Sequence, residues 1–417
     1  MQLKRVVVTG MGALTPIGNN LQDYWKALVA GTSGAGLITR FDSTNYKVKF
    51  ACELKDFDPA AHFDRKEVRK MDPFTQYAMV CSDEAIADSG FLNANHNLDR
   101  IGVVWGAGIG GLTTFYKEVM DHSKGDGTPR FSPFFIPKMI IDIAAGFISI
   151  KHKFRGPNYG TVSACASSTH ALIDAFNLIR LGKVDVVVSG GSEACVNEPS
   201  VGGFSNMKAL SERNDDFATA SRPFDQTRDG FVMGEGGASI VLEDLEHAKA
   251  RGAKIYAELV GGGMTADAYH LTAPHPEGLG AMNVMNMALE EAGISSKDID
   301  YINVHGTSTP LGDIAEIKAI KSVFGEDVYD LNISSTKSQT GHLLGGAGAV
   351  EAVACVMAVQ DDIVPPTINH KVEDPEIDSK LNLTLKKAER KTVRAALSNT
   401  FGFGGHNASV IFKKYED

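Results

Sequence analysis

Segments typical of β-strands alternate with segments typical of α-helices along the whole chain of 417 residues. A β-branched run at 5–9 precedes an apolar helical pattern at 21–30, which Asn20 can cap and Gly31 can end. Further strand patterns lie at 101–105, 184–189, 236–242, 255–260, 301–305 and 393–397, and further helix patterns at 171–181, 281–292, 313–324 and 349–359. Strands separated by helices of about 10–15 residues indicate parallel sheets covered by helices. The sequence therefore predicts an α/β fold.

The two halves of the chain show the same kind of alternation, although no sequence repeat relates them. The first half ends near 251–253, after a glycine-rich strand pattern and a charged helix pattern, and the second begins at Lys254. No linker rich in Pro or Ser separates them. We therefore expect two tightly packed domains, 1–253 and 254–417, with a functional site where loops of both halves meet.

Composition and charge argue against several classes of protein. The net charge of −10 makes nucleic acid an improbable partner. The five cysteines are odd in number and widely spaced, which argues against a disulfide framework and against a zinc knuckle. The N-terminus runs directly into a strand pattern without a signal-peptide core, and no uninterrupted apolar segment is long enough to span a bilayer. We expect a cytoplasmic protein that does not associate with membranes.

A glycine-rich turn after the first strand pattern, Gly10-Met11-Gly12, looks like the start of a dinucleotide-binding loop. The fingerprint is broken, because position 15 is threonine and Pro16 follows it. No acidic residue ends a second strand at the required distance. The sequence therefore argues against a nicotinamide cofactor.

Cys165 lies where a stretch of small residues, 161–169, runs into the helix pattern at 171–181. Free backbone N–H groups and the positive end of the helix dipole at such a position favour thiolate over thiol. The flanking Ala and Ser residues leave room for a substrate carbonyl to reach the sulfur. Cys165 is therefore a candidate nucleophile, although most cysteines of intracellular enzymes are simply small buried hydrophobic residues.

Three later segments place polar side chains at similar junctions between strand, loop and helix. His305 ends a strand pattern and opens a loop of small residues. Lys337 and His342 lie in a glycine-rich turn before the helix pattern at 349–359, and 398–407 forms a glycine-rich aromatic loop. Each feature taken alone can be structural: a hydrogen-bonded histidine, a tight turn, a packed phenylalanine. Their common position in an α/β chain favours a convergent site that combines a nucleophile, proton donors and oxyanion donors.

A basic run, Arg65-Lys66-Glu67-Val68-Arg69-Lys70, is unusual in this acidic chain. It is either a solvated helix face or a docking patch for an acidic protein or a phosphate group.

Taken together, these segments resemble the β-ketoacyl-acyl carrier protein synthase family, in particular its elongating bacterial type II members. The resemblance covers the whole chain. It rests on the Cys165 segment and on His-Gly-Thr-Ser-Thr-Pro at 305–310, Lys-Ser-Gln-Thr-Gly-His-Leu-Leu-Gly at 337–345, Gly-Phe-Gly-Gly-His-Asn at 402–407, Ser-Arg-Pro-Phe-Asp at 221–225 and the motif at 228–236. It implies a thiolase-like fold of two similar halves, each with a five-stranded mixed sheet, layered α-β-α-β-α, and normally a homodimer.

The resemblance also implies an activity, decarboxylative condensation of malonyl-acyl carrier protein with an acyl chain held on Cys165, which extends the chain by two carbons. His305 and His342 resemble the pair that assists decarboxylation, and Lys337 the lysine that supports the electrostatics around His342. The backbone N–H groups of Cys165 and Phe403 are the expected oxyanion hole. Asp313 and Glu351 are expected to order this network. No metal and no redox cofactor is implied, since the phosphopantetheine arm of the carrier holds the malonyl and acyl thioesters.

Further residues match family positions that contact the substrate or the carrier protein. Phe403 resembles the gating residue of the acyl pocket, Ile109 an acyl-tunnel residue, and Phe134 a residue that closes the tunnel across the dimer interface. The other substrate-binding positions implied by the resemblance are Thr272, Thr307, Thr309, Phe401 and Gly402. The positions implied in docking of the acidic carrier protein are Lys66, Arg69, Lys70 and Lys208.

Related classes fit less well. A thiolase would need a second cysteine in the loop 399–407, an initiating synthase would have asparagine in place of His342, and a chain-length factor would lack Cys165. The intact cysteine and histidine set also argues against a non-catalytic carrier-binding protein. A ketosynthase of a polyketide or aryl-polyene pathway stays open as an alternative, because its chemistry and carrier are the same.

Gln339 and His406 stand where relatives often have Met and Thr. His406 either alters chain-length preference or is surface variation.

Overall fold

Strands from both halves of the chain form one hydrogen-bonded sheet in the computed structural model, which describes residues 3–93 and 96–416. Within the described residues, five strands come from the first half: β1 (Val6–Leu14), β4 (Ile101–Gly106), β5 (Asn158–Thr161), β6 (Val186–Glu193) and β7 (Gly236–Asp244). Five come from the second half: β8 (Ala257–Ala266), β9 (Tyr301–Asn303), β10 (Asn332–Ser334), β13 (Ala395–Gly402) and β14 (His406–Lys413). Two short pairs, β2 (Gly36–Leu37) with β3 (Phe50–Ala51) and β11 (Ile363–Val364) with β12 (Glu389–Arg390), lie outside this sheet.

The two halves of the sheet repeat one topology. The spatial order is β5-β4-β6-β7-β1 and then β8-β14-β13-β9-β10. In each half the first strand pairs antiparallel with the last, the last antiparallel with the fourth, and the fourth and third both pair parallel with the second. The halves join where Val6–Val8 of β1 pair antiparallel with Ala257–Leu259 of β8. This mixed-sheet architecture confirms the predicted fold class, while the boundary at 253/254 stays a prediction.

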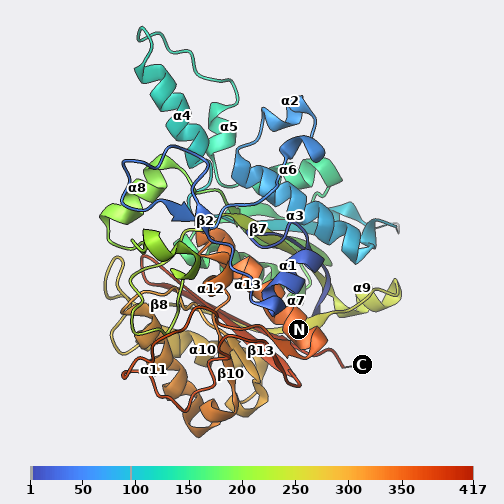
Figure 1. The fold of residues 1–417 in the computed structure, drawn as a ribbon. Helices are drawn as coiled ribbons and strands as arrows, with labels where there is room; N and C mark the ends of the chain where they lie inside the picture. Colours follow the sequence, from blue (N-terminus) through green and yellow to red (C-terminus); the bar gives the residue numbers. More distant parts are fainter. Residues whose placement is uncertain (1–2, 94–95, 417) are drawn as a thin grey trace.

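Helices cover both faces of the sheet and fill the space between its halves (Figure 1). The central helices α7 (Ser167–Arg180) and α13 (Ala347–Asp361) share one hydrophobic core with β1, β7, β13 and β14. The outer helices α3 (Pro73–Ser89) and α6 (Ile143–His152) pack on the other face of the first half. The outer helices α10 (Leu279–Ala292) and α11 (Gly312–Phe324) pack on the other face of the second half. Helices therefore bury both faces of each half of the sheet, which gives the α-β-α-β-α layering.

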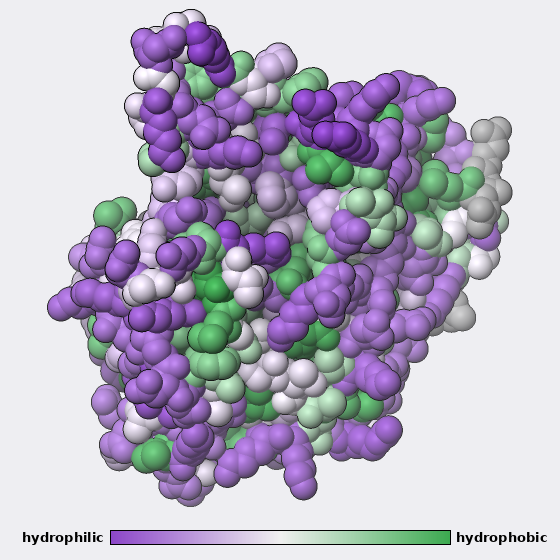
Figure 2. Space-filling model, turned by 45° about the horizontal axis from the view of Figure 1, so that its top comes forward, coloured by the Kyte–Doolittle hydropathy of each residue, from purple (hydrophilic) through white to green (hydrophobic). Residues whose placement is uncertain are grey.

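The central helix α13 is apolar on all sides because it is enclosed on all sides. The stretch Leu344–Asp361 has the length and apolar composition of a membrane span, but 83% of it is buried inside the protein. It is therefore a core helix of this fold. Polar side chains cover most of the face in Figure 2, and hydrophobic ones gather in hollows in its middle.

Local sequence signals explain the ends of several elements. The side chain of Asn20 accepts a hydrogen bond from the N–H of Asp23, and Gly31 ends α1 (Leu21–Ala30) at φ 73°, so both predicted caps are confirmed. The expected strand at 5–9 is longer, since β1 continues to Leu14, and the expected strand at 301–305 is shorter, since β9 ends at Asn303. His305 therefore lies in the loop beyond the strand.

The remaining helices lie towards the surface. Helices α4 (Leu112–Ser123) and α5 (Phe135–Met139) form an arm, residues 112–140, that projects from the body at the top of Figure 1. The basic run forms the short helix α2 (Arg65–Val68). Asp64 and Glu67 cap the N-terminus of this helix with a capping box. Helices α8 (Glu198–Asn206) and α9 (Leu245–Ala250) belong to this group, and the buried α12 (Lys337–Thr340) is the exception.

Candidate active site

Cys165 lies on a sharp turn between β5 and α7. The residue before it, Ala164, has φ 51°, in the left-handed region that a residue with a Cβ rarely adopts. The turn continues as a short 3₁₀ segment, Ala164–Ala166, into the N-terminus of α7. Gly402 of β13 packs against it so closely that a Cβ there would come within 2.8 Å of the carbonyl oxygen of Ser163. The turn therefore presents the sulfur towards loops of the second half.

His342 is the histidine nearest the sulfur. Its Nε2 lies 3.0 Å from Sγ of Cys165. Its backbone is held on both sides, because its N–H donates to Val232 O at 2.7 Å and its carbonyl accepts from the N–H of Gly234 at 2.9 Å. The ring of Phe231 packs edge-on against it at 5.3 Å. His342 is thus positioned to exchange a proton with the thiol.

His305 completes a group of three side chains. Its ring centroid lies 5.2 Å from that of His342 with the ring planes nearly perpendicular, and 5.7 Å from that of Phe401. One donor atom from each of Cys165, His305 and His342 lies within 4.8 Å of the others. The structure therefore brings together the three residues that sequence reasoning placed in one site.

Lys337 lies behind the histidines and is almost completely buried. Its Nζ donates a hydrogen bond to Oε1 of Glu351, with which it forms a buried ion pair. Burial raises the pKa of Glu351 to about 7, although the lysine charge opposes this. Burial first, and then the positive charge of Lys337, lowers the pKa of His342 and of His305 well below the ordinary histidine value. Both imidazoles are therefore neutral at neutral pH.

The protonation state of the thiol differs from the one expected from the sequence. A helix N-terminus was expected to favour thiolate, but burial raises the pKa of Cys165 to about 12, even though Lys337 and the backbone N–H of Phe403 lower it. The desolvation of a buried sulfur outweighs both effects. The resting group is therefore a thiol, and Nε2 of His342 is the base that can accept its proton.

This protonation state predicts the pH dependence of alkylation. Below a raised pKa the thiolate fraction grows about tenfold for each pH unit, so the rate at which iodoacetamide modifies Cys165 should keep rising from about pH 7 to about pH 9. Mass spectrometry of the intact protein at timed intervals measures this rate. A rate that levels off near pH 8 would mean that the helix N-terminus, rather than burial, determines the thiol pKa.

The three side chains open into a cavity of about 470 Å³. Besides them it is lined by most of the expected substrate contacts: Thr272, Thr307, Thr309, Phe401, Gly402 and Phe403, together with Lys208 at its mouth. The backbone N–H groups of Cys165 and Phe403 lie close to the sulfur and lower the pKa of the thiol. The carbonyl oxygen of a thioester formed on that sulfur would therefore lie near the same two donors.

Other expected residues lie outside the cavity lining. Lys337, Glu351 and Asp313 are buried behind it, and Asp313 accepts hydrogen bonds from the N–H groups of Phe224 and Ser308. Ile109 is partly buried and packs against a neighbouring hydrophobic core. Phe134 is on the projecting arm and is 37% exposed in the single chain. The docking positions Lys66, Arg69, Lys70 and Lys208 are all exposed.

Two buried carboxylates organise the site, and sequence reasoning missed both. Glu316 on α11 accepts hydrogen bonds from the N–H groups of His305 and Gly306 at 2.9 and 2.8 Å. Burial raises the pKa of Glu316 to about 7. Glu193 at the end of β6 accepts from backbone N–H groups of 108–110 and of Gly345, so it ties loops of both halves together. A signal for Glu316 exists, because it lies one helical turn after Asp313 on the same face.

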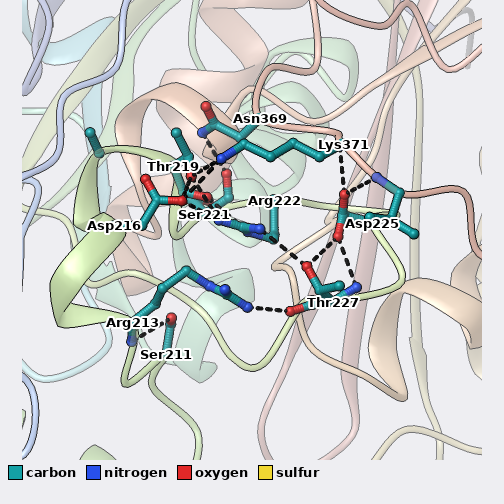
Figure 3. A network of polar contacts seen from close by, with 12 residues as sticks. Ser211, Arg213, Asp216, Thr219, Ser221, Arg222, Asp225, Thr227, Asn369 and Lys371 are labelled. Carbon is teal, nitrogen blue, oxygen red and sulfur yellow. Dashed lines mark hydrogen bonds and ion pairs between the residues drawn. The ribbon is translucent and has the colours of Figure 1, made fainter.

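The segment Ser221–Asp225, noted in the sequence for its likeness to the family, connects the first half to the catalytic loops. Figure 3 shows this segment among its polar neighbours. Ser221 donates to the carbonyl of Lys337 at 2.6 Å, and the N–H of Arg222 donates to Oγ of Ser308 at 3.0 Å. Asp225 accepts from the backbone N–H groups of Lys371 and Val372. This network fixes both catalytic loops from one side.

A two-half mixed sheet with a turn cysteine and two neutral histidines in one cavity defines a condensing enzyme of the thiolase-like class. Family models agree: the N-terminal domain of β-ketoacyl synthases matches residues 3–248 and the C-terminal domain matches residues 256–371. The chain therefore belongs to the β-ketoacyl synthase family.

Individual relatives are similar over their full length. A protein of Synechocystis named 3-oxoacyl-[acyl-carrier-protein] synthase 2 is 50% identical, and the match covers 100% of this chain and 99% of the relative. The crystal structure of a β-ketoacyl synthase from Burkholderia phymatum has 35% identity and a TM-score of 0.90, covering 99% of this chain and 100% of that chain. A type II polyketide ketosynthase, solved in complex with its acyl carrier protein and bound to a hexaketide, has 31% identity, the same TM-score and the same coverage.

Proposed function

We propose that this protein elongates acyl chains by decarboxylative condensation of malonyl-acyl carrier protein with an acyl group held on Cys165. The observation that carries the proposal is the 3.0 Å approach of the Cys165 sulfur to Nε2 of His342, with His305 in the same cavity. The names of the curated relatives support the product class, a 3-oxoacyl-acyl carrier protein.

The first half-reaction moves the acyl group to the enzyme. Sγ of Cys165 attacks the carbonyl carbon of the acyl thioester while its proton passes to Nε2 of His342. The negative oxygen receives hydrogen bonds from the N–H groups of Cys165 and Phe403. The bond from the carbonyl carbon to the carrier sulfur breaks, and that sulfur takes the proton from His342 and leaves as a thiol.

The second half-reaction forms the carbon–carbon bond. The bond between the malonyl carboxylate and the α-carbon breaks, CO₂ leaves, and the electron pair stays on the α-carbon as an enolate. Neutral His305 and His342 donate hydrogen bonds to the enolate oxygen. The first half-reaction leaves the His342 proton on Nδ1, so this ring first gains a proton on Nε2 from solvent and loses the one on Nδ1. The α-carbon attacks the acyl carbonyl, and Sγ leaves as a thiolate that takes up a proton from solvent.

Mass spectrometry of the intact protein tests this function. Acyl carrier proteins of graded chain length should add the mass of the acyl group at Cys165, and malonyl carrier protein should then release a product two carbons longer. Acylation without elongation by malonyl carrier protein would contradict the proposal.

A ketosynthase of a polyketide or aryl-polyene pathway is the second candidate, favoured by the full-length similarity to a type II polyketide ketosynthase. The same assay separates the two. Repeated extension without removal of the 3-oxo group would indicate a polyketide enzyme, whereas a single extension of saturated chains would indicate fatty acid elongation.

The proposed carrier-docking surface consists of Lys66, Arg69, Lys70 and Lys208, which are exposed cations on a chain of net charge −10. Reversing Lys66, Arg69 and Lys70 together to glutamate should raise KM for the carrier-bound substrate about tenfold, since these charges attract an acidic partner. Turnover of a free pantetheine thioester should stay unchanged. The matched control is Lys183→Glu, at the far end of α7 from Cys165; an equal rise in KM in this variant would count against the surface.

A homodimer is the proposed assembly. The arm exposes Phe115, Val119, Phe131, Phe134, Ile136 and Ile140, and Ile150 and Val162 are 75% and 61% exposed next to β5. Among the described residues β5 pairs on one side only, with β4, so its other edge is open for a strand of a second copy. Light scattering should give twice the 44.6 kDa chain mass. Ile136→Asp with Ile150→Asp should shift it towards the monomer, while the exposed control Leu37→Asp should not.

We also propose that catalysis needs no metal and that the protein is cytoplasmic. Cys165, His305 and His342 could together bind a transition metal. A metal–thiolate bond would occupy the sulfur that must form the thioester, so treatment with a chelator should leave the condensation rate unchanged. Loss of activity on chelation that zinc restores would overturn this proposal.

A further inference from the structure

A second cleft, of about 380 Å³, lies apart from the catalytic cavity and shares no lining residue with it. Most of its wall comes from the segment 370–385, and Phe224 closes one side. The start of this segment is anchored by Asp225, which accepts the backbone N–H groups of Lys371 and Val372 at 2.6 and 2.7 Å (Figure 3). The cleft is therefore part of the folded core rather than a gap beside a loose loop.

Apolar side chains form the inner surface of the cleft. Phe224 is fully buried, and Ile377, Leu381 and Leu383 are at most 8% exposed. These residues pack in the hydrophobic core of the second half, with Leu385 against its edge. The cleft can therefore bury a short apolar group of a ligand.

One polar side chain in this wall has no partner. His370 is only 8% exposed, yet its ring forms no hydrogen bond with any residue in 3–93 or 96–416. Burial lowers its pKa, with Lys386 acting in the same direction and Asp225 and Glu373 opposing it. Neither ring nitrogen is among the fully buried polar atoms, so the imidazole is open to a hydrogen bond from a molecule in the cleft.

The rim of the cleft is acidic. Asp374 pairs with Arg228 at 2.5 Å and Asp378 with Lys321 at 2.7 Å. Glu373 is exposed and forms no ion pair with any described residue. No lysine or arginine is among the described residues that line the cleft. The rim charge without an ion-pair partner, that of Glu373, is therefore negative.

We propose that this cleft is an accessory binding site for a small amphipathic amine. Its ammonium group donates hydrogen bonds to the His370 ring and to the Glu373 carboxylate, and its aliphatic part lies on Phe224, Leu381 and Leu383. The proposal is independent of the reaction at Cys165.

The cleft is connected to the catalytic cavity through one guanidinium group. Arg228 donates to Asp374 in the cleft and also to the carbonyl oxygens of Thr309 and Pro310, at 3.1 and 2.8 Å. Thr309 and Pro310 line the catalytic cavity. A ligand that moves Asp374 therefore acts on the loop that contacts the substrate. This consequence rests on the proposed condensing function, whereas binding itself does not.

Calorimetric titration of the whole protein with hexylamine, hexanol and hexanoate tests the binding site. Hexylamine should bind most tightly of the three. Glu373→Gln should weaken hexylamine binding about threefold, as expected for an exposed charge pair, and His370→Phe about tenfold, as expected for a hydrogen bond to a charged group. Glu376→Gln, an exposed carboxylate of the same segment that does not line the cleft, should bind as the unchanged protein does.

Two results would overturn the site: equal affinity for hexanol and hexylamine, or equal hexylamine affinity in the unchanged protein and in Glu373→Gln. Glu373 is exposed, so Glu373→Gln should fold, and its hexylamine affinity settles the question even if His370→Phe fails to fold.

The link to catalysis has its own readout. Saturating hexylamine should change KM for the acyl carrier substrate at least about twofold in the unchanged protein, and less at the same concentration in Glu373→Gln. Equal effects in both proteins would show a general solvent effect and overturn the link, while leaving the binding result and the proposed function intact.

Discussion

Replacing Cys165 with serine should abolish the acyl-enzyme and reduce condensation by roughly four to six orders of magnitude, the loss seen when a nucleophile is removed from a covalent mechanism. A serine hydroxyl is a far weaker acid than a thiol, and burial already raises the pKa of the thiol to about 12. Nε2 of His342, with its own pKa lowered by burial, is too weak a base to activate a hydroxyl at this position. Mass spectrometry after incubation with acyl carrier protein should therefore show the unmodified protein.

The chain contains its own control for this experiment. Five cysteines are present as free thiols and all are buried, but only Cys165 lines the catalytic cavity among the described residues. Cys81→Ala, inside α3, should still form the acyl-enzyme, with a cost in stability of about 1 kcal/mol for the small cavity. An acyl adduct of undiminished amount on Cys165→Ser would show that another residue is the nucleophile.

The sequence was sufficient to predict the arrangement of the site because each functional side chain follows a recognisable element. Cys165 precedes a strongly apolar helix, His305 follows a strand, and Lys337 and His342 occupy a glycine-rich turn before another helix. The strands that precede these junctions belong to the outer, parallel part of each half, so the junctions lie at one edge of the sheet. The predicted caps of α1 are local as well, so they too could be derived from neighbouring residues.

Properties that depend on burial could not be derived in this way. The thiol pKa follows from the packing of α7 between the two halves, and that packing is not visible around Cys165 in the sequence. Glu193 and Glu316 look like ordinary acidic residues until the fold places backbone N–H groups around them. The cleft around His370 is formed by residues 370–385 and Phe224, which are far apart in the sequence.

The two histidines should be separable by their effects on the two half-reactions. His342→Ala should slow both enzyme acylation and condensation by about 10²–10³-fold, because it removes a base from the thiol and a donor from the enolate. Among the described residues, the hydrogen bond to the sulfur comes from His342 and not from His305, whose ring centroid lies 5.2 Å from that of His342. His305→Ala should therefore slow condensation by a similar factor and leave acylation nearly unchanged. Single-turnover acylation, followed separately from malonyl decarboxylation on pre-acylated enzyme, measures both, with His247→Gln on the remote helix α9 as the control.

The pH dependence of the second half-reaction distinguishes neutral donors from charged ones. Because burial and Lys337 lower the pKa of both histidines, each ring is charged only below that lowered pKa and stays neutral through the ordinary histidine range. Decarboxylation by pre-acylated enzyme should thus be flat from about pH 8 down past about pH 6.5 and fall only in more acidic solution. A rate that changes twofold at about pH 6.5 would mean that at least one histidine titrates normally. In that case the buried lysine would not control the histidine pair, and the two neutral donors would have to be replaced in the mechanism by one neutral and one charged ring.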